Sequence, residues 1–216
     1  MSAYGAPITN DTLKELRRYK GKTITQEDRA REAIRYIQAG KKNTDALNHA
    51  LKLKYDYGDG VSTLCLLYNA TGDTLKLVED QKKDWNGQIY KEEPPRSFEN
   101  GQWIAFLHVH PGPKPSGSEA ARVYRGKNIN GETRDFLVAW MTPWSVDQNS
   151  AYTEVREENH FPQYWDYIKE EKLEKAGKIT KDETDAHLVS TVSIGGLTSP
   201  EFICVMEHRY GPLKSA

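Results

Sequence analysis

Two histidines one residue apart, in the segment FLHVHPG (106–112), are the first candidates for chemistry. Side chains two residues apart on a strand point to the same face, so His108 and His110 would present their imidazoles together. Such a pair can bind zinc, although a catalytic zinc site needs a third protein ligand. The pattern therefore raises metal-dependent chemistry as one hypothesis.

No third ligand stands at a diagnostic spacing from this pair, because the sequence has neither an HExxH nor a CxxC motif. Histidines that end a strand before a Pro/Gly-rich loop can equally form hydrogen bonds there. We therefore expect no metal and no cofactor. An enzyme or metal-binding protein that uses His108 and His110 stays open as the alternative. The side chains that could complete its site are Glu119, His160, His187 and His208.

Nucleophilic catalysis has little support in the sequence. Ser116 and Ser118 lie in SGSEAA, but no G-x-S-x-G motif stands between a strand and a helix. The glycine pair in SIGGLTS (193–199) lacks the spacing of a phosphate-binding loop. Cys65 and Cys204 lie in apolar runs and are expected to be buried and reduced, although their pairing is left open. Because no catalytic set is complete, we favour a non-catalytic protein.

Two tryptophans are better placed to bind a ligand. Trp85 precedes an Asn-Gly turn in DWNGQIY, and Trp144 follows a strand and enters the polar loop TPWSVDQN. A tryptophan at a loop tip can stack on a sugar or lie at the headgroup level of a membrane. It can also fold back and pack under its own loop, so both interpretations remain open.

The elements that must position these residues are mostly strands. Short β-branched and aromatic runs, separated by Gly, Pro and Asn turns, are typical of an antiparallel sandwich. The strand candidates are VSTLCLLYN, TLKLV, QWIAFLHV, AARVYR, RDFLVAW, AYTEV, LVSTVSI and EFICVMEH. In QWIAFLHVH, alternation places Trp103 and Leu107 on one face and Phe106 and both histidines on the other.

Helices are predicted at the N-terminus and once within the strand region. Asn10 is placed to cap a short helix that ends at Gly21. Thr25 and Asp28 form a capping box for a second helix, which Gly40 ends. A third helix follows Asn43-Thr44, and the segment as a whole carries an excess of basic residues. These observations predict a helical segment at 1–56 packed on a sandwich domain at 57–216. A late helix is expected to begin near Pro162 and end at Gly177.

Charge and hydropathy limit the possible partners. The chain has 216 residues, a formal net charge of −1 and a pI near 6.6. There is no global basic field for nucleic acid and no apolar stretch long enough to cross a membrane. The first residues turn polar almost at once, which predicts a cytoplasmic protein. The sequence leaves the oligomeric state open.

Several long segments carry a family resemblance. They are GVSTLCLLYNATGDTL (60–75), NGQWIAFLHVHP (100–111), PSGSEAARVYRGKNINGETRDFLVAWMTPW (115–144) and SIGGLT (193–198). On these segments the chain resembles the plant jasmonate-induced proteins of about 23 kDa. More distantly, its strand-turn-strand and Trp-x-Gly features are similar to the actinoporin-like and nakanori-like lipid-binding sandwiches.

The resemblance implies an actinoporin-like β-sandwich in plant stress or defence responses, which binds a lipid headgroup or a carbohydrate through loop aromatics. Matching motif positions give a candidate binding surface of Trp85, Tyr124, Trp144 and Tyr152. Actinoporin-like pore formers insert an amphipathic N-terminal helix, whereas the first helix here is short and dense in charge. We therefore do not expect pore formation.

Overall fold

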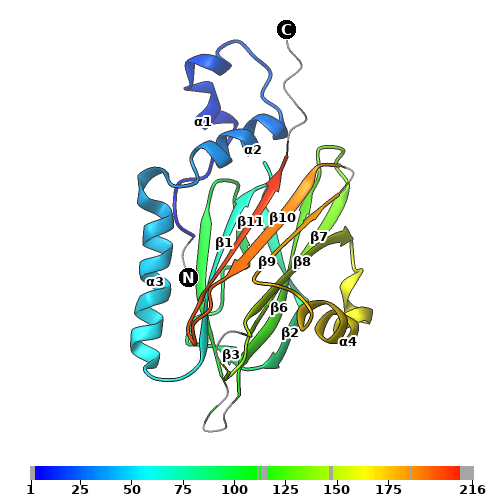
Figure 1. Ribbon diagram of the computed structural model, residues 1–216. Coiled ribbons are helices and arrows are strands. Elements are labelled where there is room, and N and C mark those ends of the chain that lie inside the picture. The colour runs from blue at the N-terminus through cyan, green and yellow to red at the C-terminus, as the bar shows by residue number, and fades with distance from the viewer. Residues whose placement is uncertain (1–2, 111, 113–115, 146–147, 185, 210–216) are drawn as a thin grey trace.

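The structure is a computed structural model that describes residues 3–110, 112, 116–145, 148–184 and 186–209. Two β-sheets face each other, helices cover the outer face of one sheet, and a short helical segment lies against the other (Figure 1). This architecture confirms the predicted mainly β sandwich with N-terminal helices and one inserted helical segment. The segments proposed as strands all form strands.

The first sheet has the strand order β3-β5-β1-β11-β10-β9. Its strands are β1 (Ser62–Ala70), β3 (Gln88–Ile89), β5 (Trp103–Val109), β9 (Ile179–Glu183), β10 (Leu188–Ile194) and β11 (Glu201–His208). The pair β1–β11 is parallel, with Leu64 opposite Glu201, and the other pairs in the sheet are antiparallel. The expectation of an antiparallel sandwich therefore holds except at this one pair.

The second sheet has the order β4-β2-β6-β7-β8 and is antiparallel. Its strands are β2 (Leu75–Asn86), β4 (Ser97–Phe98), β6 (Ser118–Lys127), β7 (Thr133–Thr142) and β8 (Ser150–Glu157). β2 continues through Gly87 into β3 of the first sheet, so one stretch of chain serves both layers.

The N-terminal helices lie in the predicted helical segment. They are α1 (Asn10–Lys14), η1 (Arg17–Tyr19), α2 (Gln26–Arg35), η2 (Ala39–Lys41) and α3 (Lys42–Tyr57). Their bounds match the predicted capping signals only at Thr25, because α2 ends before Gly40 and α3 begins ahead of Asn43-Thr44. Thr25 and Asp28 form the predicted capping box of α2. Thr9, rather than Asn10, caps α1, because its hydroxyl accepts the Thr12 amide. α3 runs along the outer face of β1 and β5 (Figure 1).

The inserted helix is a series of short pieces, η3 (Phe161–Tyr164), α4 (Trp165–Tyr167) and the π-helix η4 (Ile168–Leu173). Pro162 lies in the first turn, as expected. The buried side chains Phe161, Ile168 and Leu173 pack this segment onto the outer face of β6 and β7. Both sheets are thus covered on part of their outer faces.

The alternation in β5 is confirmed and decides where its two sets of side chains lie. Ile104 and Phe106 enter the core between the sheets. Trp103, Ala105 and Leu107 face the N-terminal helices in a second apolar layer. This strand therefore joins the sandwich core to the helical layer. None of the described helices is both long and apolar enough to cross a bilayer.

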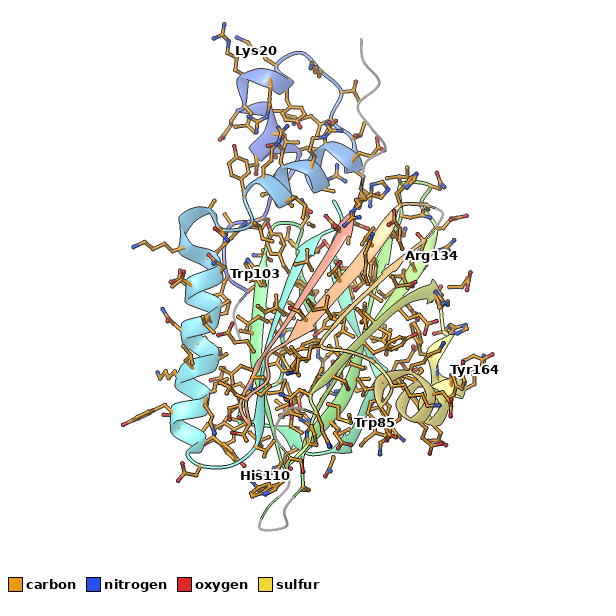
Figure 2. All side chains as sticks on the ribbon, viewed as in Figure 1. Lys20, Trp85, Trp103, His110, Arg134 and Tyr164 are labelled. Atoms are coloured by element: carbon orange, nitrogen blue, oxygen red, sulfur yellow. The ribbon has the colours of Figure 1, made fainter. Side chains whose placement is uncertain are left out.

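The C-terminal ends of α3, β5, β7 and β10 lie at one end of the sandwich, at the bottom of Figure 1, which we call the loop end. α1 and α2 cover the opposite end. His110 lies at the loop end and Lys20 at the far tip of the helical end (Figure 2). The two ends of the molecule are therefore formed by different elements.

Candidate functional site

His108 lies inside the sandwich and is completely buried. Its Nδ1 lies 2.8 Å from the Ser118 hydroxyl and its Nε2 lies 3.2 Å from Oδ1 of Asp84. Nη1 of Arg122 lies 2.8 Å from the same carboxylate oxygen. Burial lowers the pKa of His108, although the Asp84 carboxylate opposes this shift. A neutral imidazole thus joins β5 to β6 and β2.

The contacts of Ser118, His108 and Asp84 have the order found in serine hydrolases, yet the setting is that of a structural network. The Ser118 hydroxyl also lies 2.7 Å from the Thr63 hydroxyl and is completely buried. Oγ1 of Thr63 lies 2.8 Å from that of Thr142. Since each hydroxyl has a partner and Ser118 is shut away from solvent, this set satisfies buried polar groups.

The candidate metal ligands do not converge. Glu119 lies near η4, with an oxygen 3.8 Å from Nζ of Lys169, and burial raises the pKa of its carboxyl. His160 stacks on Tyr164 with ring centroids 4.7 Å apart, beside the inserted helical segment. Across the described ranges, no three His, Cys, Asp or Glu side chains are grouped to hold a metal ion.

His110 leaves the strand and joins a row of aromatic rings at the loop end. Its ring meets Trp144 edge-on at 5.9 Å and Tyr57 edge-on at 6.1 Å. Tyr57 in turn meets Tyr90 at 5.3 Å. Edge-to-face pairs at these distances are favourable. We call this row, Tyr57, Tyr90, His110 and Trp144, the aromatic end.

The aromatic end is assembled around a close approach of the backbone. Gly60, just before β1, has φ +126°, and a Cβ atom there would lie 2.6 Å from Nε2 of His110 and 2.9 Å from the hydroxyl of Tyr57. Only glycine leaves space for both rings at this position. The backbone between α3 and β1 thereby determines the packing of the His110 ring against the Tyr57 ring.

A recess of about 480 Å³ opens beside Trp144. Its lining comes from the last turns of α3, the α3–β1 connection, the β7–β8 loop and the β10–β11 loop, and includes Lys54, Trp144, Thr198 and Ser199. The Trp144 side chain is 51% exposed, so its ring is open to a ligand. Asn149 ties two of these loops together, since its amide nitrogen donates to the carbonyls of Gly195 (2.7 Å) and Leu197 (2.8 Å).

Lys54 supplies a cation at this recess. Its Nζ donates to the carbonyl oxygens of Gly58 (2.7 Å) and Gly60 (2.9 Å) and lies 5.2 Å from the centre of the Tyr57 ring. Burial lowers the pKa of this ammonium group, while the Asp59 carboxylate opposes the shift. A lysine has three donors, so Lys54 can still offer a hydrogen bond to an anionic or hydroxylated ligand.

The other three predicted binding residues lie elsewhere. Tyr124 is completely buried between the sheets, edge-on to Phe98 at 5.5 Å, so it does not contribute to a surface. Trp85 meets Trp165 edge-on at 6.2 Å beneath the inserted helical segment. Tyr152 is partly buried in the same apolar cluster. Of the four, only Trp144 faces solvent at the loop end.

The sequence did not predict that Tyr57 contacts His110 or that Tyr90 contacts Tyr57. Tyr57 is the last residue of α3 and Tyr90 directly follows β3. The two residues are far apart in the chain, so no local sequence pattern indicates that their rings meet. A weak signal existed, because His110, Trp144 and Gly60 all stand directly beside predicted strand ends. The pairing depends on which loops share one end of the sandwich, and this is set by strand order.

Comparisons with known proteins agree with this architecture. The 23 kDa jasmonate-induced protein of Hordeum vulgare is 40% identical over 210 residues, which cover 96% of this chain and 98% of that protein. A jasmonate-induced protein homolog of Atriplex canescens is 30% identical over 148 residues, covering 67% of this chain and 77% of the homolog.

Among solved structures, the crystal structure of the lipid binding protein Nakanori matches with a TM-score of 0.84 and 25% sequence identity. The match covers 95% of this chain and 100% of that one. The Nakanori-like protein family matches residues 4–209, which include both the helical layer and the sandwich. The chain therefore belongs to the Nakanori-like protein family.

Proposed function

We propose that this protein acts in stress or defence responses by binding a lipid headgroup at its aromatic end, without catalysis. The observation that carries the proposal is the half-exposed Trp144, held edge-on by His110 beside a recess that contains a lysine and two hydroxyl groups. An indole ring suits the boundary between acyl chains and headgroups. Lys54, Thr198 and Ser199 suit the phosphate and hydroxyl oxygens of a headgroup.

The relatives support the same assignment. One homologue is induced by jasmonate, and Nakanori is a lipid-binding protein of the same fold. Exposed apolar side chains add to the case, because Leu197 is 72% exposed in the β10–β11 loop and Tyr55 is 87% exposed near the end of α3. Both lie toward the loop end, where they would widen the apolar contact with a bilayer. The predicted cytoplasmic location can be checked with a fluorescent fusion.

A vesicle-binding experiment tests the proposal. Wild-type protein and Trp144→Ala are compared by co-sedimentation with vesicles of phosphatidylcholine, sphingomyelin or phosphatidylinositol phosphates, and on a glycan array. Tyr167→Ala is the matched control, because Tyr167 is also 51% exposed but lies on α4, away from the loop end. We expect Trp144→Ala to weaken vesicle binding by about tenfold or more, as is typical of a central aromatic contact.

The same panel can contradict the proposal. Equal vesicle binding by Trp144→Ala and Tyr167→Ala would show that the aromatic end does not contribute to lipid binding. If wild type binds glycans but no vesicles, and Trp144→Ala loses this binding, the aromatic end would be a binding site for a carbohydrate and not for a lipid. Background signal from wild type on every vesicle and glycan would exclude both ligands.

A further inference from the structure

A second surface lies at the opposite end of the molecule. Arg17, Arg18, Lys20 and Lys22 fall within six residues on η1 and the turn that follows it, and all four are exposed. We call these four residues the basic tip. Figure 2 shows Lys20 at the far helical end, with His110 at the other extreme of the sandwich. The basic tip is thus separate from the aromatic end.

The basic tip is held by a buried tyrosine and a buried carboxylate. Tyr19, between the cations, is 6% exposed, and its hydroxyl donates to Oε1 of Glu32 at 2.8 Å. Arg18 pairs with the same carboxylate. The amide of Lys22 donates to the Tyr19 carbonyl at 3.0 Å. Because Tyr19 points inward and these contacts hold the turn, the side chains of the basic tip point toward solvent.

Most of this positive charge is not neutralised locally. Among the described residues, Arg17, Lys20 and Lys22 form no ion pair, and residues 14–22 contain five basic residues and one acidic residue. The whole chain has a net charge of −1, so the remainder of the molecule is net negative. This separation gives the protein an electric field that turns its basic tip toward an anionic surface.

We propose that the basic tip docks on membranes rich in anionic phospholipid. Each lysine or arginine near an anionic leaflet contributes about 1 kcal/mol of attraction, which corresponds to about a fivefold change in partitioning. The tip is a protrusion on a single turn, which fits a broad charged surface and not a groove. Tyr19, the aromatic residue between the cations, is buried and offers no face on which a nucleic acid base could stack.

This surface goes beyond the proposed function, since it involves different residues and a different lipid chemistry. If the aromatic end also binds a headgroup, which rests on the proposed function, the two ends can engage two bilayers at once. The protein would then cluster anionic vesicles. Monovalent binding at the basic tip needs no contribution from the aromatic end.

The test compares vesicles of phosphatidylcholine alone with vesicles that contain about one third phosphatidylserine, by co-sedimentation and by turbidity. The triple variant R17E/K20E/K22E should lose about 100-fold in affinity for the anionic vesicles, given about fivefold or more per residue. A matched triple variant, K52E/K175E/K181E, changes the net charge equally at exposed lysines on α3, after η4 and on β9. Because distant charges are screened beyond about 8 Å, it should lose no more than about threefold.

Trp144→Ala separates this proposal from the preceding one. Its affinity should still rise by the same factor as that of wild type when phosphatidylserine is added to the vesicles, because the basic tip supplies this increment, but it should fail to cluster them. Clustering by Trp144→Ala would count against the aromatic end and leave the basic tip in place. Equal binding by the two triple variants would overturn the basic tip, as would preferential binding of transfer RNA over anionic vesicles at the same salt concentration. Far-ultraviolet circular dichroism confirms that each variant is folded.

Discussion

Nζ of Lys42 lies 3.1 Å from the hydroxyl oxygen of Tyr68, inside the layer between α3 and the first sheet. The same ammonium group donates to the carbonyl of Gly101 at 2.7 Å, and the Tyr68 hydroxyl donates to the carbonyl of Ala33 at 2.6 Å. One buried lysine and one buried tyrosine thus connect α2, α3, β1 and the loop before β5. The helical layer is held on the sandwich by polar contacts as well as by apolar packing.

This lysine should make stability depend on alkaline pH. Burial lowers the pKa of Lys42 to about 8. The unfolded chain therefore binds the proton more tightly between that value and the ordinary lysine pKa, so stability rises as pH increases through this window. Between pH 7 and 9.5 the free energy of unfolding should rise by about 1–2 kcal/mol relative to Lys42→Met. Urea titrations of both proteins at the two pH values measure this, and parallel curves would contradict it.

Glu32 should make the helical end sensitive to acid. It is completely buried and accepts hydrogen bonds from Tyr19 (2.8 Å), Arg35 (2.8 Å) and Arg18. Burial disfavours its charge, but these partners outweigh burial and hold the pKa of the carboxyl below its ordinary value. Its contribution to stability is therefore present above the unfolded pKa and is lost as pH falls through the folded one.

Replacing this carboxylate tests the assignment at neutral pH. Glu32→Gln should lower the free energy of unfolding by about 1–3 kcal/mol, the cost of leaving charged partners poorly satisfied. The exposed Glu15, changed to Gln, serves as the control and should alter stability by less than about 0.5 kcal/mol. Chemical denaturation measures the midpoint of each variant. Equal midpoints for Glu32→Gln and Glu15→Gln would contradict the prediction.

Ser118 should behave as a structural hydroxyl. Ser118→Ala removes partners from Nδ1 of His108 and from the Thr63 hydroxyl, and should cost about 1–3 kcal/mol of stability. A fluorophosphonate probe, which reports activated serines, should leave the wild-type protein unlabelled because the hydroxyl is completely buried. Labelling of wild type that disappears in Ser118→Ala would instead restore the enzyme hypothesis.

Replacing Trp140 or Trp144 by alanine should change the stability of the protein by very different amounts. Trp140 is completely buried in the sandwich core, and Trp140→Ala should cost about 3–5 kcal/mol of stability. Trp144 is half exposed, so Trp144→Ala should change stability by less than about 0.5 kcal/mol. Thermal denaturation of the two variants checks this, and a large loss for Trp144→Ala would mean that its ring supports the fold.

Local sequence predicted the strands and the second helix because their signals are local. Alternation in β5 and the capping box at Thr25 depend on neighbours within a few residues. β9 was missed because ITKDE is charged and lies at a sheet edge, where burial does not select apolar residues. The short β3 and β4 pair over only two residues each, too few to leave a pattern.

The candidate site was harder to predict than the fold. Trp144 was identified from its position in a polar loop, but its contact with His110 joins residues far apart in the chain. Tyr124 was placed wrongly on a surface, because β6 is covered on both faces and its alternation does not distinguish them. Motif matching located a strand correctly and could not tell which of its side chains reach solvent.

The parallel pairing of β1 with β11 has a consequence for biosynthesis. Leu64 lies opposite Glu201, so β1, a central strand of the first sheet, can pair with β5 early but gains its second neighbour only after residues 201–208 have left the ribosome. Until then one edge of β1 keeps unpaired amide and carbonyl groups, which can recruit other chains. Nascent polypeptides that stop before residue 201 should accordingly aggregate or require a chaperone, whatever ligand the finished protein binds.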